Sequence, residues 1–448
     1  MDGMVLGLQE LVRQPSVSAT GEGIEECARL VRGMLERCGI PAEILRLGGG
    51  AAPVVYGEVR SKANPEKTIL FYNHYDVQPA GDASLWDEPP FAGIVKDGSV
   101  FGRGAADDKG ELVTRVWAVK ACLEETGDVP CNVKFVVEGE EETGSEHMGA
   151  YLSRYQKKFS CDGVIWEFGY VDASDMPIIS LGMKGLLFAE LRASGPARDA
   201  HSSLAVLIEN PAWRLVEAIS SMRSADGTIL IKDWYEEAAP LSDDELKLLD
   251  KERFDEDSFK TEYGIVSFVG DTGGLEAKKA LAAGATCNIA GLSSGYAGEG
   301  TKTILPAGAI AKLDFRLVPN MDSKKQVERL RSHLHDGGFG DIEVRIFHVE
   351  AAARTDPSAP FVADVKAAAD AVFGGHILNI SSAGTGPMAQ FAEYLGAPCV
   401  AVGCTHVFSR IHSPNEFARV DLLRDAAMCI CHVMWNFGAG HHSPKFQK

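Results

Sequence analysis

Two segments that predict buried strands are each followed directly by titratable side chains. Lys67–Tyr72 is rich in β-branched and aromatic residues and leads to His74 and Asp76. Polar and apolar residues alternate along Cys131–Val137, which predicts a second strand, and the acidic run Glu138–Glu142 follows it. Because strand-like and helix-like segments alternate from residue 24 to residue 167, this part of the chain predicts an α/β layer with a central sheet.

A third group of acids precedes a predicted helix. Asp107 and Asp108 stand before Glu111–Lys120, whose apolar residues have helical spacing. The first of these acids, Asp107, could serve only as a helix N-cap, the commonest use of Asp in that place. Two adjacent acids leave one for each role, so this loop can also supply a metal ligand.

These residue types fit a site for two metal ions. Divalent cations bind carboxylate oxygen and imidazole nitrogen, and a two-metal site needs one carboxylate that can bridge. Glu141 and Glu142 can divide the work, one as a ligand and the other accepting a proton from metal-bound water. Asp76 points the same way as His74 in extended backbone and can fix the tautomer of its imidazole. The alternative is a solvated strand end and a solvated acidic loop.

Several blocks in a fixed order extend this pattern, so that the chain resembles the metallopeptidase family of carnosine dipeptidase, glutamate carboxypeptidase and aminoacylase. The resemblance spans nearly the whole chain. The matching blocks are Asn73–Pro79, Trp86, Pro90–Phe91, Gly102–Gly110, Glu138–Ser145, Val164–Glu167, Arg198–Ser202, Arg316–Met321 and Ile411–Glu416.

The resemblance implies five metal ligands. His74 and Glu167 would hold one ion, Glu142 and His412 would hold the other, and Asp107 would bridge both. The expected cofactor is a pair of divalent ions, with Zn2+ as the default for mixed histidine and carboxylate ligation and Mn2+ or Co2+ as alternatives. Some relatives have Asp where this chain has Glu167, and the longer side chain can still ligate.

The resemblance also implies catalytic roles. Glu141 would be the general base, Asp76 would orient His74, and His201 would donate a hydrogen bond to the oxyanion. In relatives the equivalent of His201 often comes from the partner subunit of a dimer, so a homodimer is expected. From local pattern alone, His201 and His412 are loop histidines with no ligand spacing.

A further set of residues matches positions that contact substrate in the family. Arg316 lies on the polar face of a predicted strand, where a solvated arginine is the alternative. Ser381–Ala383 stands where dipeptidase-like members carry charged residues, so the substrate is less certain than the chemistry. The implied contacts are Arg316, Thr303, Gly384 and Thr385.

Changes of character along the chain predict two domains. A catalytic domain with a central mixed sheet flanked by helices is expected from residues 1–179 and 355–448. An inserted α+β lid domain, which would also serve dimerisation, is expected from residues 180–354. The charged stretch Trp234–Tyr263 predicts a surface excursion inside the lid, and Pro357–Phe373 predicts an amphipathic helix.

Composition and charge limit the kinds of binding partner and the cellular location that can be expected. A formal charge of −19 argues against nucleic acid or an anionic membrane as a partner. No stretch approaches the roughly 20 apolar residues that span a bilayer, and Met1–Met4 lacks the basic start of a signal peptide. The ten cysteines are scattered through apolar contexts, which fits reduced thiols and a cytoplasmic protein.

Two short motifs point elsewhere. Gly102–Gly104 resembles the start of a dinucleotide-binding loop, but Asp107 occupies the place of the third glycine and would repel a pyrophosphate. Gly291–Gly295 fits the Gly-x-Ser-x-Gly pattern of a nucleophile elbow, but no helical pattern follows.

The leading hypothesis is therefore a dinuclear metal-dependent hydrolase that cleaves the amide bond of dipeptides or related substrates with a free carboxylate. The alternatives are an N-acyl amino acid deacylase or carboxypeptidase, a catalytically inactive binding protein on the same fold, and a nucleotide-dependent oxidoreductase.

Overall fold

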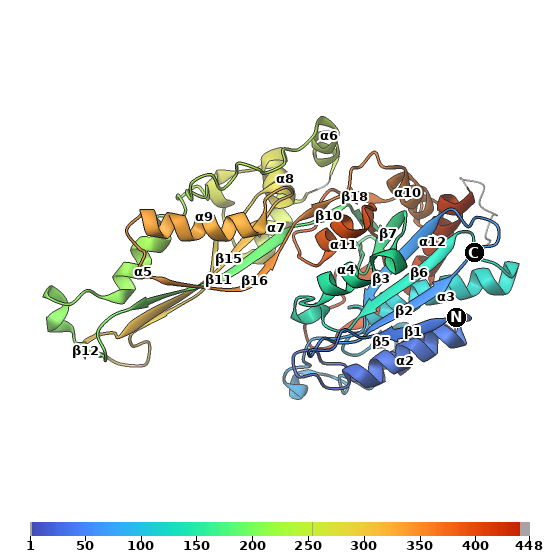
Figure 1. Ribbon diagram of the computed structural model, residues 1–448, viewed down its shortest axis with the longest axis horizontal. Helices are drawn as coiled ribbons and strands as arrows, with labels where there is room; N and C mark the ends of the chain where they lie inside the picture. The colour runs from blue at the N-terminus through green and yellow to red at the C-terminus, as the bar shows by residue number, and fades with distance from the viewer. Residues whose placement is uncertain (1, 253, 440–448) are drawn as a thin grey trace. The chain divides into compact units, whose positions relative to one another are not determined.

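The computed structural model describes residues 2–252 and 254–439, which form two compact units (Figure 1). Within the described residues, the first unit comprises residues 2–182, 354–380 and 386–439, and the second comprises residues 183–252, 254–353 and 381–385. Among the described residues no helix combines the length and the apolar character that crossing a bilayer requires.

An eight-stranded mixed sheet forms the centre of the first unit. Its middle strands β6, β3, β7 and β19 are parallel, whereas β1, β2 and β6 pair antiparallel at one side. In sheet order the strands are β1 (Ala42–Leu45), β2 (Val54–Val59), β6 (Asn132–Glu138), β3 (Thr68–His74), β7 (Gly163–Trp166), β19 (Cys399–Ala401), β9 (Ile178–Ser180) and β18 (Ile377–Asn379).

Helices cover this sheet and bury its alternating side chains. Phe71 of β3 joins the main hydrophobic core, while the neighbouring Tyr72 packs in tilted geometry against Trp166 and Phe391, with ring centroids 4.3 and 4.5 Å apart. Successive residues of a strand point to opposite faces, so both faces of β3 are buried. The helices of this unit are α1 (Asp2–Arg13), α2 (Ile24–Arg37), α3 (Lys109–Thr126), α4 (Met148–Phe159), α10 (Pro360–Phe373), α11 (Met388–Leu395) and α12 (Val420–Ala439).

The second unit is built on a four-stranded antiparallel sheet. Its strand order is β13 (Asn288–Ser294), β15 (Gly308–Leu317), β11 (Gly185–Ser194) and β16 (Glu343–Glu350). Apolar side chains alternate along β11 and β15 and pack against α5 (Pro211–Ser220) and α9 (Ser323–Asp336). The charged stretch between these elements contains α6 (Asp243–Lys251) and α7 (Glu256–Tyr263), and α8 (Gly274–Ala283) follows.

These observations confirm the predicted fold class, a mixed sheet flanked by helices together with a separate antiparallel sheet. Element ends differ by a few residues from the sequence-based expectation. β3 continues through His74, because its pairing with β6 extends to the His74–Glu138 pair. Helix α10 begins at Pro360 rather than Pro357, with proline at the first turn, where its missing N–H costs nothing.

Candidate metal centre

The carboxyl ends of three adjacent parallel strands carry two of the five candidate ligands, His74 and Glu167. His74 is the last residue of β3, Glu138 ends β6 opposite it, and Glu167 follows β7. In open α/β sheets the carboxyl ends of the strands are the usual place for ligands. The sheet order β6, β3, β7 therefore brings together side chains that are far apart in the sequence.

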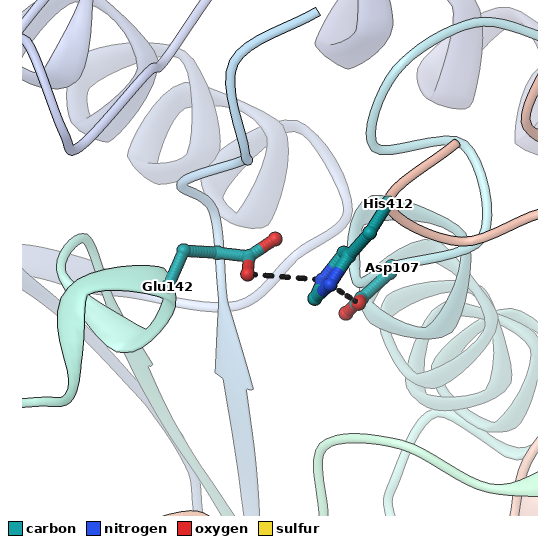
Figure 2. A group of neighbouring side chains, drawn as sticks. All are labelled: Asp107, Glu142 and His412. Atoms are coloured by element: carbon teal, nitrogen blue, oxygen red, sulfur yellow. Dashed lines mark ion pairs between the residues drawn. The ribbon is translucent and has the colours of Figure 1, made fainter. Parts of the chain in front are cut away.

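Asp107 faces two histidines with its two carboxylate oxygens. Its Oδ1 lies 3.1 Å from Nε2 of His74, and its Oδ2 lies 3.1 Å from Nε2 of His412. Figure 2 shows His412 between Asp107 and Glu142, whose Oε2 is also 3.1 Å from His412 Nε2. This is the arrangement that a bridging carboxylate requires, with one oxygen for each of two metal positions.

A tight loop delivers Asp107 to this position. Gly104 adopts φ +85°, and a Cβ at that residue would lie 2.6 Å from a methyl group of Val77. Only glycine meets both demands without strain. Asp108 follows, and the Asp107–Asp108 peptide bond is cis.

The adjacent Asp108 has a different use from its neighbour. Asp108 stands before the first residue of α3, but its side chain makes no capping hydrogen bond. Its Oδ2 accepts instead from Nδ2 of Asn73 at 2.7 Å and from the backbone N–H of His74 at 3.0 Å. The suggestion that Asp107 serves only as a helix cap is wrong, because the carboxylate of Asp107 points to the two histidines.

The ring of His74 is almost completely buried. Its Nδ1 lies 3.0 Å from the backbone oxygen of Asp76 and 3.4 Å from the Asp76 carboxylate. Both groups are acceptors, so Nδ1 carries a proton, and this is the arrangement in which a neutral imidazole can bind a metal ion through Nε2. The nearer partner of the imidazole is thus the Asp76 carbonyl rather than its side chain.

The Asp76 carboxylate positions the loop that carries the glutamates. Its two oxygens accept from the backbone N–H groups of Glu141 at 3.2 Å and Glu142 at 3.0 Å. Gly139 lets this loop pass close to the core, since a Cβ there would lie 2.2 Å from the hydroxyl of Tyr75. The Asp76 side chain therefore fixes the backbone of the candidate ligand Glu142 and of the candidate base Glu141 together.

Further hydrogen bonds orient the candidate ligand Glu142. Gln78 donates from its Nε2 to Oε2 of Glu142 at 2.9 Å and from its backbone to Oε1 at 3.2 Å. The nearby Glu141 places its Oε2 4.0 Å from Nε2 of His74. Glu140 has no role of this kind, because it accepts from the backbone of Ala52 and of His147 and so anchors the far side of the loop.

Crowded acids dominate the electrostatics of the site. Burial raises the pKa of Glu141 well above its usual range, and the charges of Asp107 and Glu142 add to this effect. Burial likewise raises the pKa of Glu167, with a contribution from Glu141. Hydrogen bonds with Asp107 and Glu142 raise the pKa of His412 to about 10. Burial opposes ionisation of Asp107, but its hydrogen bonds with His412 and His74 outweigh that effect and lower its pKa.

The donor set fits divalent metal ions. One ligand atom from each of Asp107, Glu142 and His412 can lie within 4.8 Å of the others. Oε2 of Glu167 is buried and has no hydrogen-bond partner, which is costly for a carboxylate oxygen unless a cation is nearby. Mixed imidazole and carboxylate donors suit zinc and related ions.

Two of the remaining candidates lie together in the second unit. The pairing of β12 (Ala200–His201) with β14 (Ile304–Leu305) places His201 beside the exposed Thr303, whose carbonyl accepts from Ser202. Nδ1 of His201 accepts from the backbone N–H of Ser203 at 3.2 Å. A neutral ring in this arrangement carries its proton on Nε2, which is then available as a donor.

The other candidates of the second unit form a separate cluster. Nη1 of Arg316 donates to the hydroxyl of Thr385 at 2.5 Å, and this hydroxyl donates to the backbone oxygen of Lys184 at 2.8 Å. The carbonyl of Gly384 accepts from the backbone of Lys184 at 3.1 Å. Within the described part of the chain, Arg316 forms no ion pair with a carboxylate. A half-buried guanidinium without an anion is suited to binding one.

Sequence reasoning did not assign roles to several supporting residues. Gln78, Asp108 and Glu416 all lie inside the blocks that carry the family resemblance, but no local pattern distinguishes them. Their partners are distant in the sequence, as with Asp108 and Asn73. Only the three-dimensional arrangement shows which carboxylate or amide orients which ligand.

Comparison with known proteins defines the class. The model of peptidase family M20/M25/M40 matches residues 70–436. The chain therefore belongs to this family and is a metallopeptidase homologue. Its fold matches a solved M20 family metallo-carboxypeptidase from Sulfolobus solfataricus with a TM-score of 0.92 and 36% identity, covering 98% of this chain and 100% of that one.

Curated relatives include dipeptidases. Cys-Gly metallodipeptidase dug1 of Schizosaccharomyces pombe is 32% identical over 286 residues, and human Beta-Ala-His dipeptidase is 29% identical over 288 residues. These matches cover 62% and 63% of this chain. The matched regions span 59% and 56% of the respective relatives, less than two thirds of their length.

Proposed function

We propose that this protein is a dinuclear metal-dependent hydrolase that cleaves the amide bond of dipeptides or related substrates with a free carboxylate. The observation that carries the proposal is the carboxylate of Asp107, whose two oxygens each lie 3.1 Å from a different histidine. His74 and Glu167 would hold one ion, and Glu142 and His412 the other. Zinc is the first choice for this donor set, with manganese or cobalt as alternatives.

When bound, the ions would supply Lewis acidity and lower the pKa of water at the site. Glu141 is placed to accept the proton from that water and to pass it to the leaving amine. Burial raises the pKa of this carboxyl, and a base works best when its pKa lies nearer the working pH than that of an ordinary glutamate. Asp76 holds the backbone of Glu141 and thus the position of the base.

Substrate recognition would fall to the second unit. Arg316, oriented by Thr385, would bind the free carboxylate of the substrate, and the backbone near Gly384 would add a polar contact. This arrangement suits dipeptides, and it also suits C-terminal residues of longer peptides and N-acyl amino acids. The metallo-carboxypeptidase match over the whole chain makes carboxypeptidase activity the second candidate.

We further propose a homodimer in which His201 acts across the interface. Arg316 stands eight positions beyond Gly308 on β15, about 25 Å away along an extended strand, whereas His201 pairs with Ile304 before β15 begins. A dipeptide cannot span that distance, so one substrate would meet Arg316 of one chain and His201 of the other. Thr303 would accompany His201.

Exposed apolar side chains beside His201 support this assembly. Val206 and Leu207 are 86% and 85% exposed, and Trp213 on α5 is 67% exposed. A second copy of the chain could cover them. Sedimentation at several concentrations measures the oligomeric state, and a monomer that retains full activity would contradict the proposal.

The cytoplasmic location stays a prediction, which the ten free cysteines favour.

The substitution Glu141→Gln tests the function most directly. We expect the variant to retain two metal ions and to lose turnover by about 10²–10⁴-fold, because the base is removed while the ligands remain. Metal content and hydrolysis of dipeptides, N-acyl amino acids and blocked dipeptides are measured together. Turnover near the wild-type rate would exclude Glu141 as the base, and two bound ions without hydrolysis by the wild type would favour a binding protein.

A further inference from the structure

Glu416 is fully buried, and its carboxylate is not one of the five candidate metal ligands. Its Oε2 accepts from Nη1 of Arg103 at 2.6 Å and from the backbone of Gly104 at 3.1 Å. Its Oε1 accepts from the backbone N–H groups of Ala106 at 3.0 Å and Asp107 at 3.1 Å. Four donors therefore converge on one side chain, and three of them belong to the loop that carries Asp107.

The same residue lies at the end of the loop that carries His412. Strand β21 (Phe417–Arg419) begins directly after it and pairs with β5 (Ser99–Phe101). The backbone oxygen of Glu416 also accepts from Gly102 at 2.9 Å. Main-chain and side-chain bonds of one residue thus join two loops that are more than 300 positions apart.

His412 needs such support. It adopts φ 57°, as Arg410 and Asn415 nearby adopt φ 57° and 63°. Residues other than glycine adopt this left-handed conformation rarely, and three within one short loop must be imposed by the surrounding structure. Closure of the loop by the bond from Phe417 to Ser409, at 3.1 Å, supplies part of that constraint.

We propose that Glu416 is a positioning residue that sets the separation of Asp107 and His412, and through it the affinity of the centre for its metal ions. The inference rests on the proposed function. The Glu416 carboxylate fixes the backbone of the bridging ligand, and its own backbone fixes the exit of the His412 loop. Buried groups that orient metal ligands in this way commonly change metal affinity by about 10–100-fold when they are removed.

The substitution Glu416→Gln tests the proposal. The amide is nearly isosteric, but its NH2 group must face either the N–H groups of the Asp107 loop or the guanidinium of Arg103, which are all donors. We expect Co2+ to bind the metal-free variant about 10–100-fold more weakly than the wild type, with an altered visible spectrum. We also expect kcat to fall while KM stays near the wild-type value.

Glu190→Gln is the matched control. Glu190 is also buried and pairs with an arginine, Arg192, but it lies on the sheet of the second unit. Both variants remove a buried carboxylate that pairs with an arginine, so both should unfold at lower temperature, while only Glu416→Gln should lose Co2+ affinity. Equal weakening of Co2+ binding by Glu190→Gln would overturn the proposal.

Glu416→Asp provides a second variant in case the glutamine form does not fold. Aspartate keeps the charge but is one methylene too short to contact Arg103 and the loop together, so we expect a smaller loss of affinity in the same direction. Wild-type Co2+ affinity and spectrum in either folded variant would overturn the inference alone. Failure of the wild type to bind a second Co2+ would overturn the proposed function as well.

Discussion

The two units of the molecule hold their candidate functional residues in different ways. In the first unit, His74 and Glu167 are buried at strand ends, and backbone or side-chain hydrogen bonds fix the ring of His74 and the loop of Glu142. In the second unit, His201 and Thr303 are exposed; His201 belongs to a strand of two residues, and Thr303 directly precedes another. Groups that share metal ions need fixed geometry, whereas groups that meet a substrate can sit on adaptable elements.

The largest expected effect comes from substituting a candidate metal ligand of the first unit. Asp107→Asn removes one charge from the bridging position, so we expect loss of at least one metal ion and a fall in activity of about three orders of magnitude, given the several kcal/mol that such ions contribute. Metal analysis and turnover check this. Asp108→Asn is the matched control, because the side-chain oxygen that asparagine keeps can still accept from Asn73 and from the backbone N–H of His74. Equal metal loss in both variants would contradict the ligand assignment.

A smaller effect is expected in the second unit. Arg316→Met should raise KM for substrates with a free carboxylate by about 10–100-fold, since a hydrogen bond to a charged group contributes about 1.5–3 kcal/mol. Metal content should not change. Arg192→Met on the neighbouring strand is the control, because Arg192 is already paired with Glu190. If carboxamide analogues lose as much affinity as carboxylates, Arg316 does not bind the carboxylate.

The smallest expected effect concerns Glu138, a buried carboxyl group at the end of β6. Burial raises the pKa of Glu138 to about 8 from its ordinary 4.5, although Tyr72 and Ser145 donate hydrogen bonds to it. Between pH 4.5 and 8 the folded state therefore binds more protons at this site than the unfolded state, and stability falls as the pH rises.

Glu138→Gln does not titrate, so it should gain about 1–3 kcal/mol relative to wild type between pH 5 and pH 8. Denaturant unfolding at several pH values measures the difference. Glu58→Gln serves as the control, because hydrogen bonds from Arg60 and Tyr56 lower the pKa of Glu58 against the effect of burial, and its difference from wild type should be flat in this range. A flat difference for Glu138→Gln as well would show that Glu138 is ionised throughout.

The sequence predicted the parts of the first unit that depend on local pattern. Strands β3 and β6 follow from runs of apolar residues, and the acids after them mark the carboxyl edge of the sheet. His412 could not be found in this way, because its loop has no periodicity and its partners, Asp107 and Glu142, lie far earlier in the chain. Its place in the site came from family resemblance.

Supporting residues were still harder to predict. Asp76 was expected to orient His74 through its carboxylate, yet that carboxylate accepts from Glu141 and Glu142 while the Asp76 carbonyl lies nearer the imidazole. Which acceptor a ring nitrogen meets depends on fractions of an ångström in backbone position. These backbone positions result from the packing of the whole sheet and cannot be predicted from any short segment of the sequence.

The position of β19 in the sheet has a consequence for biosynthesis. β19, at residues 399–401, lies between β7 and β9, so the emerging chain exposes the unpaired edge of β7 until β19 has been synthesised. Synthesis from Glu142 to His412 takes on the order of 10–60 s at about 5–20 residues per second. An open strand edge during that interval invites association with other chains. A product truncated before β19 would keep this open edge and would also lack His412, one of the candidate ligands.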